Sequence, residues 1–166
     1  AAAIIVSFDD TGESGLVKHR LVTYSEGAEH TIIRGGGNKF FFKDHPYDAT
    51  LHSFSMEGKK LLKLAMQRVP EFTEKFFCEI ALPIREVDLI IPHQASKSGL
   101  LLLDSLLDGN TDKVVNNLAS YGNCIAASIP LALTEAIESG RLKRGDSCLL
   151  IGTAAGFSVG GLLFKF

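Results

Sequence analysis

The stretch Val87-Asp88-Leu89-Ile90-Ile91-Pro92-His93-Gln94-Ala95-Ser96 joins a short, mainly apolar run to a polar turn. We predict a buried strand over Val87–Ile91, because the run is short and the proline after it favours extended backbone at Ile91. Leucines at helical spacing follow, and they predict a helix over Ser96–Leu107 that the Ser96 side chain caps. His93 therefore lies at the C-terminal end of a strand, which is where ligands bind in open α/β sheets.

Predicted strands and helices alternate on both sides of this unit. The other predicted strands are Ala1–Phe8, Lys18–Ser25, Val114–Leu118, Cys148–Gly152 and Ser158–Phe164. A long helix is predicted from Glu57 to Ile80, with a kink or short break at Pro70, and a further helix over Cys124–Ser139 that Gly140 ends. This order predicts a layered α/β domain, in which helices cover a mixed sheet whose strands are buried on both faces.

The first part of the chain carries three further expectations. Its two strands, Ala1–Phe8 and Lys18–Ser25, are expected to form an antiparallel pair, and the apolar start suggests that more sequence precedes Ala1 in the native polypeptide. The segment Glu26–Phe54 lacks a sustained period, so we expect an irregular excursion over the surface. We expect Phe40–Phe42 within it to be core or the roof of a pocket rather than an acyl tunnel.

Composition excludes several classes of protein. The 166 residues are 46% hydrophobic, which suits one domain with a real core. A net charge of -2 leaves no basic surface for nucleic acid, and no apolar run reaches the roughly 20 residues of a membrane helix. The three cysteines fit neither a disulfide framework nor a metal site, so we expect a soluble, cytoplasmic protein without bound metal.

A second polar motif, Tyr121-Gly122-Asn123-Cys124-Ile125-Ala126-Ala127-Ser128, precedes the predicted helix of the last third of the chain. An imidazole and a carboxamide at two neighbouring strand-to-helix junctions can both donate a hydrogen bond to one carbonyl oxygen. His93 and Asn123 are thus candidates for one site that stabilises an enolate or oxyanion. The structural alternatives are a histidine that only bonds a carbonyl in a turn and an asparagine that only caps a helix.

A third candidate element is the small-residue segment Gly152–Gly161, where the backbone can approach a ligand closely. Its N–H groups can form an oxyanion hole, or the glycines can serve turn geometry alone. Cys124 is the cysteine with a physical argument for reactivity, because a helix N-terminus lowers the pKa of a thiol. Cys78 and Cys148 lie in apolar sequence and are expected to be small core residues.

Together these motifs resemble the C-terminal half of 3-oxoacyl-acyl-carrier-protein synthase III, a condensing enzyme with the thiolase fold. The residues that carry the resemblance are Met56-Glu57-Gly58, Pro92-His93-Gln94-Ala95, Gly122-Asn123 with Ala126-Ala127-Ser128-Ile129-Pro130, and Gly156-Phe157-Ser158-Val159-Gly160. The opening segment Ala1–Ser7 also resembles the strand that begins this half. The resemblance covers essentially all of residues 1–166 and implies one thiolase-like half.

The resemblance implies a cysteine–histidine–asparagine triad in a homodimeric enzyme of fatty acid synthesis or a related pathway. His93 and Asn123 match the histidine and asparagine, and the backbone of Ala155 and Gly156 matches the oxyanion hole. The nucleophilic cysteine belongs to the N-terminal half, so this chain alone is predicted inactive. The implied substrates are an acyl-CoA and malonyl-acyl-carrier protein, with no cofactor, and Lys97 is a weak candidate for docking the carrier protein.

Several positions depart from the family pattern. Ser96 and Ser98 replace an asparagine and an arginine, while Thr153 and Ala155 stand where a phenylalanine and a glycine are usual. These changes leave the acceptor open and admit a specialised synthase of secondary metabolism. Two alternatives to the decarboxylating synthase therefore stand: a non-catalytic domain that binds acyl thioesters or carrier protein, and an acyltransferase that does not decarboxylate.

Overall fold

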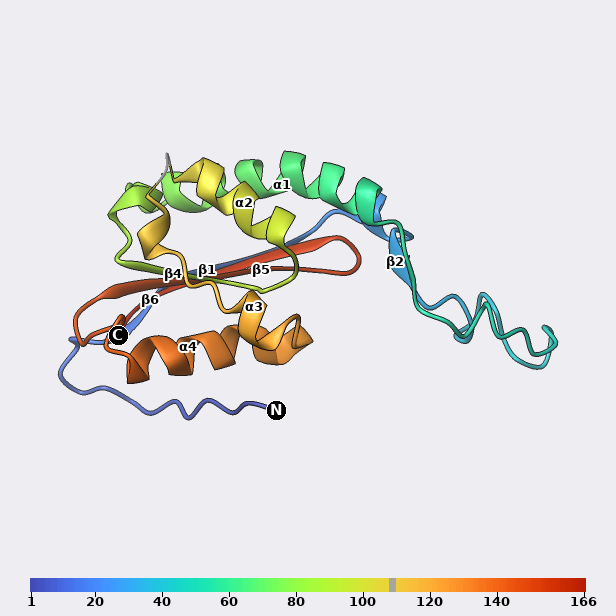
Figure 1. Cartoon of the computed structure of the whole chain (residues 1–166), viewed down its shortest axis with the longest axis horizontal. Coiled ribbons are helices and arrows are strands. Elements are labelled where there is room, and N and C mark those ends of the chain that lie inside the picture. The colour runs from blue at the N-terminus through green and yellow to red at the C-terminus, as the bar shows by residue number, and fades with distance from the viewer. Residues whose placement is uncertain (108–109) are drawn as a thin grey trace.

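The computed structural model describes residues 1–107 and 110–166 and has a mixed α/β architecture (Figure 1). The main sheet has the order β1-β6-β5-β4, formed by β1 (Gly15–Thr23), β6 (Ser158–Lys165), β5 (Ser147–Ala154) and β4 (Leu89–Pro92). The helices are α1 (Gly58–Cys78), α2 (Lys97–Leu106), α3 (Leu118–Tyr121) and α4 (Ser128–Glu138). Figure 1 shows α1 and α2 on one face of the sheet and α3 and α4 on the other, which confirms the predicted layering.

The pairing of β4 with β5 is parallel, whereas β5 with β6 and β6 with β1 are antiparallel. In this register Pro92 at the end of β4 lies beside Ile151, and β5 continues to Ala154 before it turns back into β6. The β5–β6 turn therefore extends past the C-terminal end of β4. That end of the sheet is where the chain leaves β4 to enter α2.

Strand β4 is buried along its whole length because both faces of the sheet are covered there. Ile90 belongs to the core cluster formed with α1 and α2, while Leu89 and Ile91 belong to a second cluster that includes Ala132 and Ala136 of α4. Successive side chains of a strand point to opposite faces, so a continuous apolar run is what this position requires. The predicted strand in this region is confirmed.

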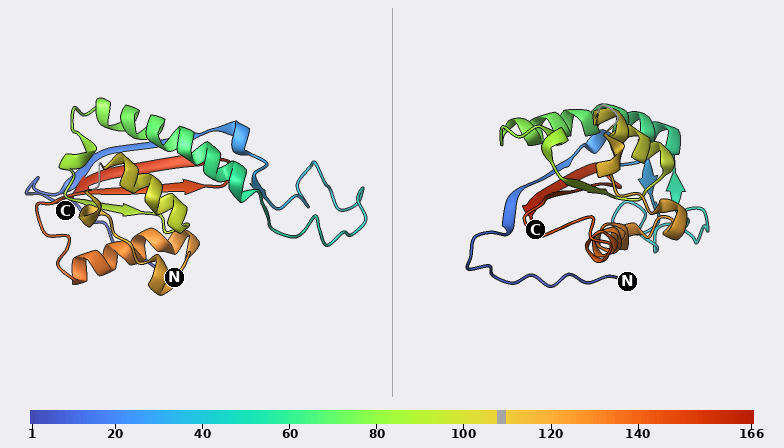
Figure 2. Two further views of the ribbon diagram at one scale, coloured as in Figure 1. Left: turned by 45° about the horizontal axis from the view of Figure 1, so that its top comes forward. Right: turned by 60° about the vertical axis from the view of Figure 1, so that its left-hand side comes forward.

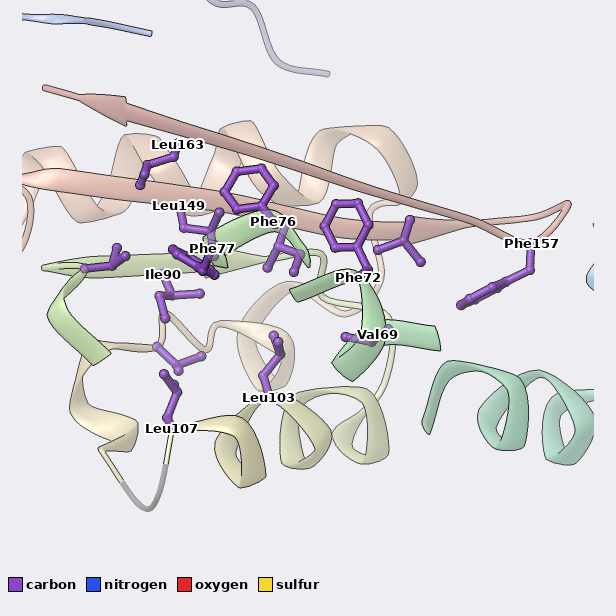
Figure 3. Close-up of a cluster of buried hydrophobic side chains, with 14 of the residues drawn as sticks. Val69, Phe72, Phe76, Phe77, Ile90, Leu103, Leu107, Leu149, Phe157 and Leu163 are labelled. Carbon is purple, nitrogen blue, oxygen red and sulfur yellow. The ribbon is translucent and has the colours of Figure 1, made fainter. Parts of the chain in front are cut away.

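Aromatic residues of α1 fill the larger core cluster (Figure 3). Phe72 and Phe76 are each 1% exposed and stack at a ring-centroid distance of 5.9 Å. Gly161 of β6 lets them approach the sheet, since a Cβ there would lie 3.1 Å from Phe72 and 3.3 Å from Phe76. The fit between helix and sheet thus depends on two rings and one missing side chain.

Residues Ala1–Phe8 do not form the predicted buried strand. They are exposed and lack regular secondary structure, and Figure 1 shows the start of the chain running below α4. The predicted pairing of this segment with the next strand is also wrong, because β1 pairs with β6, with Leu21 opposite Gly160. Apolar, β-branched composition indicates a segment suited to burial but does not specify the strand that pairs with it.

Other element boundaries differ from expectation in small ways. Helix α1 is continuous through Pro70, so of the expected kink or short break the break is absent. The strand predicted over Val114–Leu118 is reduced to a single parallel bridge between Val114 and Ile90, after which α3 begins at Leu118. A 3₁₀ turn over Ile125–Ala127 precedes α4, which therefore begins later than the predicted helix.

Ser96 caps α2 as predicted, with its Oγ accepting a hydrogen bond from the Gly99 N–H at 3.1 Å. One apolar expectation fails, because Cys78 is an exposed residue at the end of α1 rather than a small core residue. Apolar composition alone does not distinguish the buried face of a helix from the exposed one.

The excursion before α1 contains the two-residue strands β2 (Thr31–Ile32) and β3 (Ser55–Met56), which pair with each other. The chain between them projects away from the sheet as an arm (Figures 1 and 2). Phe41 and Phe42 on the arm are 38% and 71% exposed. The surface excursion is confirmed, but Phe40–Phe42 is neither core nor roof in this structure.

Replacing Phe72 with alanine should lower the free energy of unfolding by about 3–5 kcal/mol, because it removes a buried ring and leaves a cavity against β6. Phe42→Ala makes the same chemical change on the arm and should cost less than about 0.5 kcal/mol. Urea denaturation of the two variants beside the wild type measures both values. Equal losses would contradict the assignment of Phe72 to the core.

Candidate functional site

His93 follows β4 directly and is anchored by its backbone. Its N–H donates to the carbonyl oxygen of Ile151 at 2.8 Å, which continues the parallel ladder one residue beyond Pro92. The residue is half-buried, and it borders a small hollow of about 60 Å³ whose walls are mainly apolar side chains of α1, α2 and β5. His93 therefore places a polar ring at the margin of an apolar hollow.

Burial lowers the pKa of the His93 imidazole below its usual value of 6.5, since removal from water disfavours the charged ring. At neutral pH the ring is accordingly uncharged. A neutral imidazole has one N–H donor and one nitrogen acceptor. The group can donate a hydrogen bond to a substrate oxygen without carrying a positive charge.

The carboxamide of Asn123 has a defined orientation. Its Oδ1 accepts the backbone N–H of Ile125 at 2.8 Å, so its NH₂ group is turned the other way. Asn123 is exposed, and the residue before it, Gly122, has a φ of 68° where α3 ends. The NH₂ group of Asn123, which can donate a hydrogen bond to a ligand, is thus left open.

Ile125, whose N–H makes this contact, also has an unfavourable backbone conformation. Its φ is 53°, which is rare for a β-branched side chain, and the side chain is 77% exposed. A left-handed residue of this type costs on the order of 1–3 kcal/mol and persists only where its surroundings enforce it. Strain next to Asn123 marks this turn as a candidate functional site. Nothing in the sequence pattern signals the strain at Ile125.

The two motifs meet over β5. A Cβ placed on Gly152 would lie 3.3 Å from the Cβ of His93 and 3.3 Å from Cδ1 of Ile129, in the first turn of α4. Gly152 thus leaves room for both His93 and the start of α4. Asn123 lies in the turn that leads into α4, so the two motifs reach the same residue of β5 through His93 and through this helix.

The backbone candidates Ala155 and Gly156 form the β5–β6 turn at this same end. Gly156 has a φ of 123°, a conformation that favours glycine. Among the described residues only Ala81 and Ile125 are non-glycine residues with positive φ, so alanine at position 155 meets no conformational obstacle. Lys97, the weak docking candidate, is exposed in the first turn of α2.

The cysteines differ in their surroundings. Cys124 is half-buried, and its Sγ contacts the carbonyl oxygen of Tyr121 at 3.4 Å. Cys148 is fully buried, and burial raises the pKa of its thiol to about 12, which leaves it protonated and confirms it as a core residue. The described part of the chain holds no cluster of three or more potential metal ligands and no helix that could cross a membrane.

Three comparisons with known proteins place this site in a family. The family model described as 3-oxoacyl-[acyl-carrier-protein (ACP)] synthase III C terminal matches residues 79–166, which is more than half of the chain. The chain belongs to the 3-oxoacyl-acyl-carrier-protein synthase III family. Both His93 and Asn123 lie within the matched residues, and so does the β5–β6 turn.

Similar proteins extend the match over the rest of the chain. Beta-ketoacyl-acyl-carrier-protein synthases III from Koribacter versatilis and Syntrophomonas wolfei are 30% and 31% identical over 100% of this chain, and the chain spans 50% of each. The crystal structure of the synthase III from Aquifex aeolicus is 28% identical, with a TM-score of 0.78 over 95% of this chain and 46% of that one. The predicted thiolase-like fold of a C-terminal domain of this synthase family is confirmed.

The site of this synthase III domain also contains residues to which the sequence pattern assigned no role. Gln94 stands in the Pro92–Ala95 motif, and its side chain is completely buried. Glu135 of α4 accepts hydrogen bonds from Asn117 and Tyr121, and no sequence signal singles it out. The hydrogen bonds of both side chains join segments that are separate in sequence, which is why pattern alone does not find them.

The His93 imidazole should titrate with a midpoint below 6.5, because burial favours the neutral ring. Between the His93 pKa of the folded chain and the usual pKa of 6.5, the unfolded chain then binds more protons than the folded one. The contribution of His93 to stability is therefore complete above about pH 6.5 and falls as the pH drops through the folded pKa. An NMR titration of the imidazole protons, assigned by comparison with His93→Asn, measures the midpoint. A value at or above 6.5 would contradict the effect of burial.

Proposed function

We propose that this chain is the C-terminal half of an acyltransferase that condenses an acyl group, taken from acyl-CoA, with malonyl-acyl-carrier protein to give a 3-oxoacyl product. Membership of the synthase III family supports an enzymatic role. The chain spans about half the length of the curated relatives it matches, so we propose the activity for a protein of that full length. The observation that carries the proposal is a neutral imidazole beside Gly152, together with an oriented carboxamide in the turn that leads into α4.

In the proposed reaction, the bond between the malonyl carboxylate and the α-carbon breaks and carbon dioxide leaves. The electron pair passes into the thioester, where charge develops on the carbonyl oxygen as an enolate forms. His93 and the Asn123 amide donate hydrogen bonds to that oxygen, and such donors act most strongly when the charge appears. Removing a single donor of this kind costs about 3–4 kcal/mol of transition-state stabilisation.

The enolate carbon then attacks the carbonyl of an acyl thioester held on the nucleophilic cysteine of the N-terminal half. A carbon–carbon bond forms, and the cysteine leaves as a thiolate. The backbone N–H groups of Ala155 and Gly156 are proposed to receive the oxyanion of this step. The chemistry requires no cofactor, since loss of carbon dioxide supplies the electron pair.

A neutral His93 suits this role. A charged imidazolium would hold the malonyl carboxylate by attraction and so favour the ground state before carbon dioxide leaves. A neutral ring donates a hydrogen bond chiefly to the enolate oxygen, where charge develops. Such a donor binds the transition state more strongly than the ground state, which is what catalysis needs. The lowered pKa of His93 is therefore consistent with the proposed donor role.

We propose that the partners are acyl carrier protein, acyl-CoA and the N-terminal half of the same polypeptide, within a homodimer. An apolar groove of about 1320 Å³ between the segment Ile4–Phe8, α4 and the strands β1, β5 and β6 supports a covering half. It is lined by exposed apolar side chains such as Ile137 and Leu162, at 39% and 36% exposure. Exposed Lys97 remains the proposed contact for the acidic carrier protein.

His93→Ala in the full-length enzyme should abolish decarboxylation of the malonyl thioester while the cysteine still accepts an acyl group, because the first step does not use this donor. Release of labelled carbon dioxide and the mass of the acyl-enzyme measure the two steps. His19→Ala, on exposed β1, is the matched control and should leave both unchanged. Normal decarboxylation by His93→Ala would overturn the role assigned to His93, and absent decarboxylation by the wild type would favour a binding domain or a non-decarboxylating transferase.

The chain alone should carry no acyl group after incubation with acetyl-CoA. The Cys124 thiol faces the Tyr121 carbonyl, and Cys148 is buried and protonated at neutral pH. Intact-mass spectrometry tests this directly, with Cys124→Ser as the control for any adduct. A mass increase of one acetyl group that Cys124→Ser removes would mean that Cys124 is a nucleophile.

A further inference from the structure

The side chain of Gln94 is completely buried between the His93 strand end and the segment before α3. Its Nε2 donates to the carbonyl oxygens of Pro92 and Val115, each at 3.0 Å. Its Oε1 accepts the backbone N–H of Asn117 at 3.2 Å. A carboxamide with both protons and its oxygen engaged has one orientation, so Gln94 joins two separate backbone segments rigidly.

Glu135 continues this connection on the far side of Asn117. Its Oε2 accepts the Asn117 side-chain Nδ2 at 2.6 Å, and its Oε1 accepts the Tyr121 hydroxyl at 2.6 Å. These two hydrogen bonds lower the pKa of the Glu135 carboxyl, so the group is ionised and both of its oxygens act as acceptors at neutral pH. Asn117 precedes α3 and Tyr121 is its last residue, so one carboxylate of α4 holds this single helical turn at both ends.

The Asn123 turn begins where α3 stops. Tyr121 is followed by Gly122 and then by Asn123. The Tyr121 carbonyl oxygen also accepts a hydrogen bond from the Cys124 thiol. A shift of α3 would therefore move Asn123 with it. In the opposite direction, Asn117 is tied through Gln94 to Pro92, the residue before His93.

We propose that Glu135 and Gln94 are positioning residues, which hold Asn123 in place relative to His93 through α3. The network links the two donors across segments that are far apart in sequence, without touching the substrate itself. The inference rests on the proposed function, because the two donors must reach one enolate oxygen. A displacement of about 1 Å at such a site can reduce the rate by 100-fold.

Glu135→Gln in the full-length enzyme is the direct test, because glutamine keeps the shape but offers one acceptor oxygen in place of two. We expect decarboxylation to slow by about 10- to 100-fold. The rate of cysteine acylation and the KM for the malonyl thioester should stay within about twofold of the wild type, a split that general loss of stability does not produce. Glu138→Gln is the matched control, since Glu138 lies on the same helix and is exposed.

Tyr121→Phe keeps the test decisive if Glu135→Gln folds poorly. It removes one hydroxyl from a side chain that is 48% exposed, and Tyr47→Phe on the arm is its control. We expect a smaller loss of decarboxylation in the same direction, with acylation unchanged and the melting temperature near that of the wild type. The proposal would be overturned if Glu135→Gln and Tyr121→Phe decarboxylate as fast as the wild type. It would also be overturned if the variants lose decarboxylation and cysteine acylation in equal proportion.

A readout without turnover separates this inference from the proposed function. The side-chain amide protons of Asn123, followed by NMR in the full-length enzyme, should shift and exchange faster with solvent in Glu135→Gln and not in Glu138→Gln. A shift in an enzyme whose wild type does not decarboxylate would support the positioning role and reject the decarboxylating function. Unchanged amide signals with an active wild type would reject the positioning role alone.

Discussion

The rest of the structure depends on the burial of β4 between two helical layers. Because β4 is covered on both faces and paired in parallel with β5, the point at which the chain leaves the sheet is fixed to within one residue. His93 occupies that point and continues the ladder with its own N–H. The apolar strand thus places a polar ring at the sheet end, and packing on both sides prevents a change of register.

Hydrogen bonds complete the second half of the site. The segment from Val114 to the start of α4 contributes one bridge to the sheet, and it is further held by Gln94 and by the Glu135 carboxylate. A buried, fully bonded group such as the Gln94 carboxamide specifies one geometry, because each lost bond leaves an unpaired group behind. These bonds fix α3, from which the chain enters the Asn123 turn.

Burial and one local hydrogen bond set the two donors in different ways. Desolvation keeps His93 neutral, whereas the Ile125 N–H donates to the Oδ1 of Asn123 and so leaves the NH₂ group of that carboxamide open. Neither effect involves a charge partner. Both arise from the fold of the chain around the site.

The sequence by itself determined the α/β class, the β4 strand with its capped helix α2, the closing strands β5 and β6, and the pairing of His93 with Asn123 as candidates. These features follow from local periodicity and capping, which neighbouring residues specify. Tertiary structure alone decided that β1 pairs with β6, that Val114–Leu118 is a bridge and a helical turn, and that Gln94 and Glu135 connect the two motifs. Strand partners and buried hydrogen bonds join residues far apart in the chain, so no local pattern contains them.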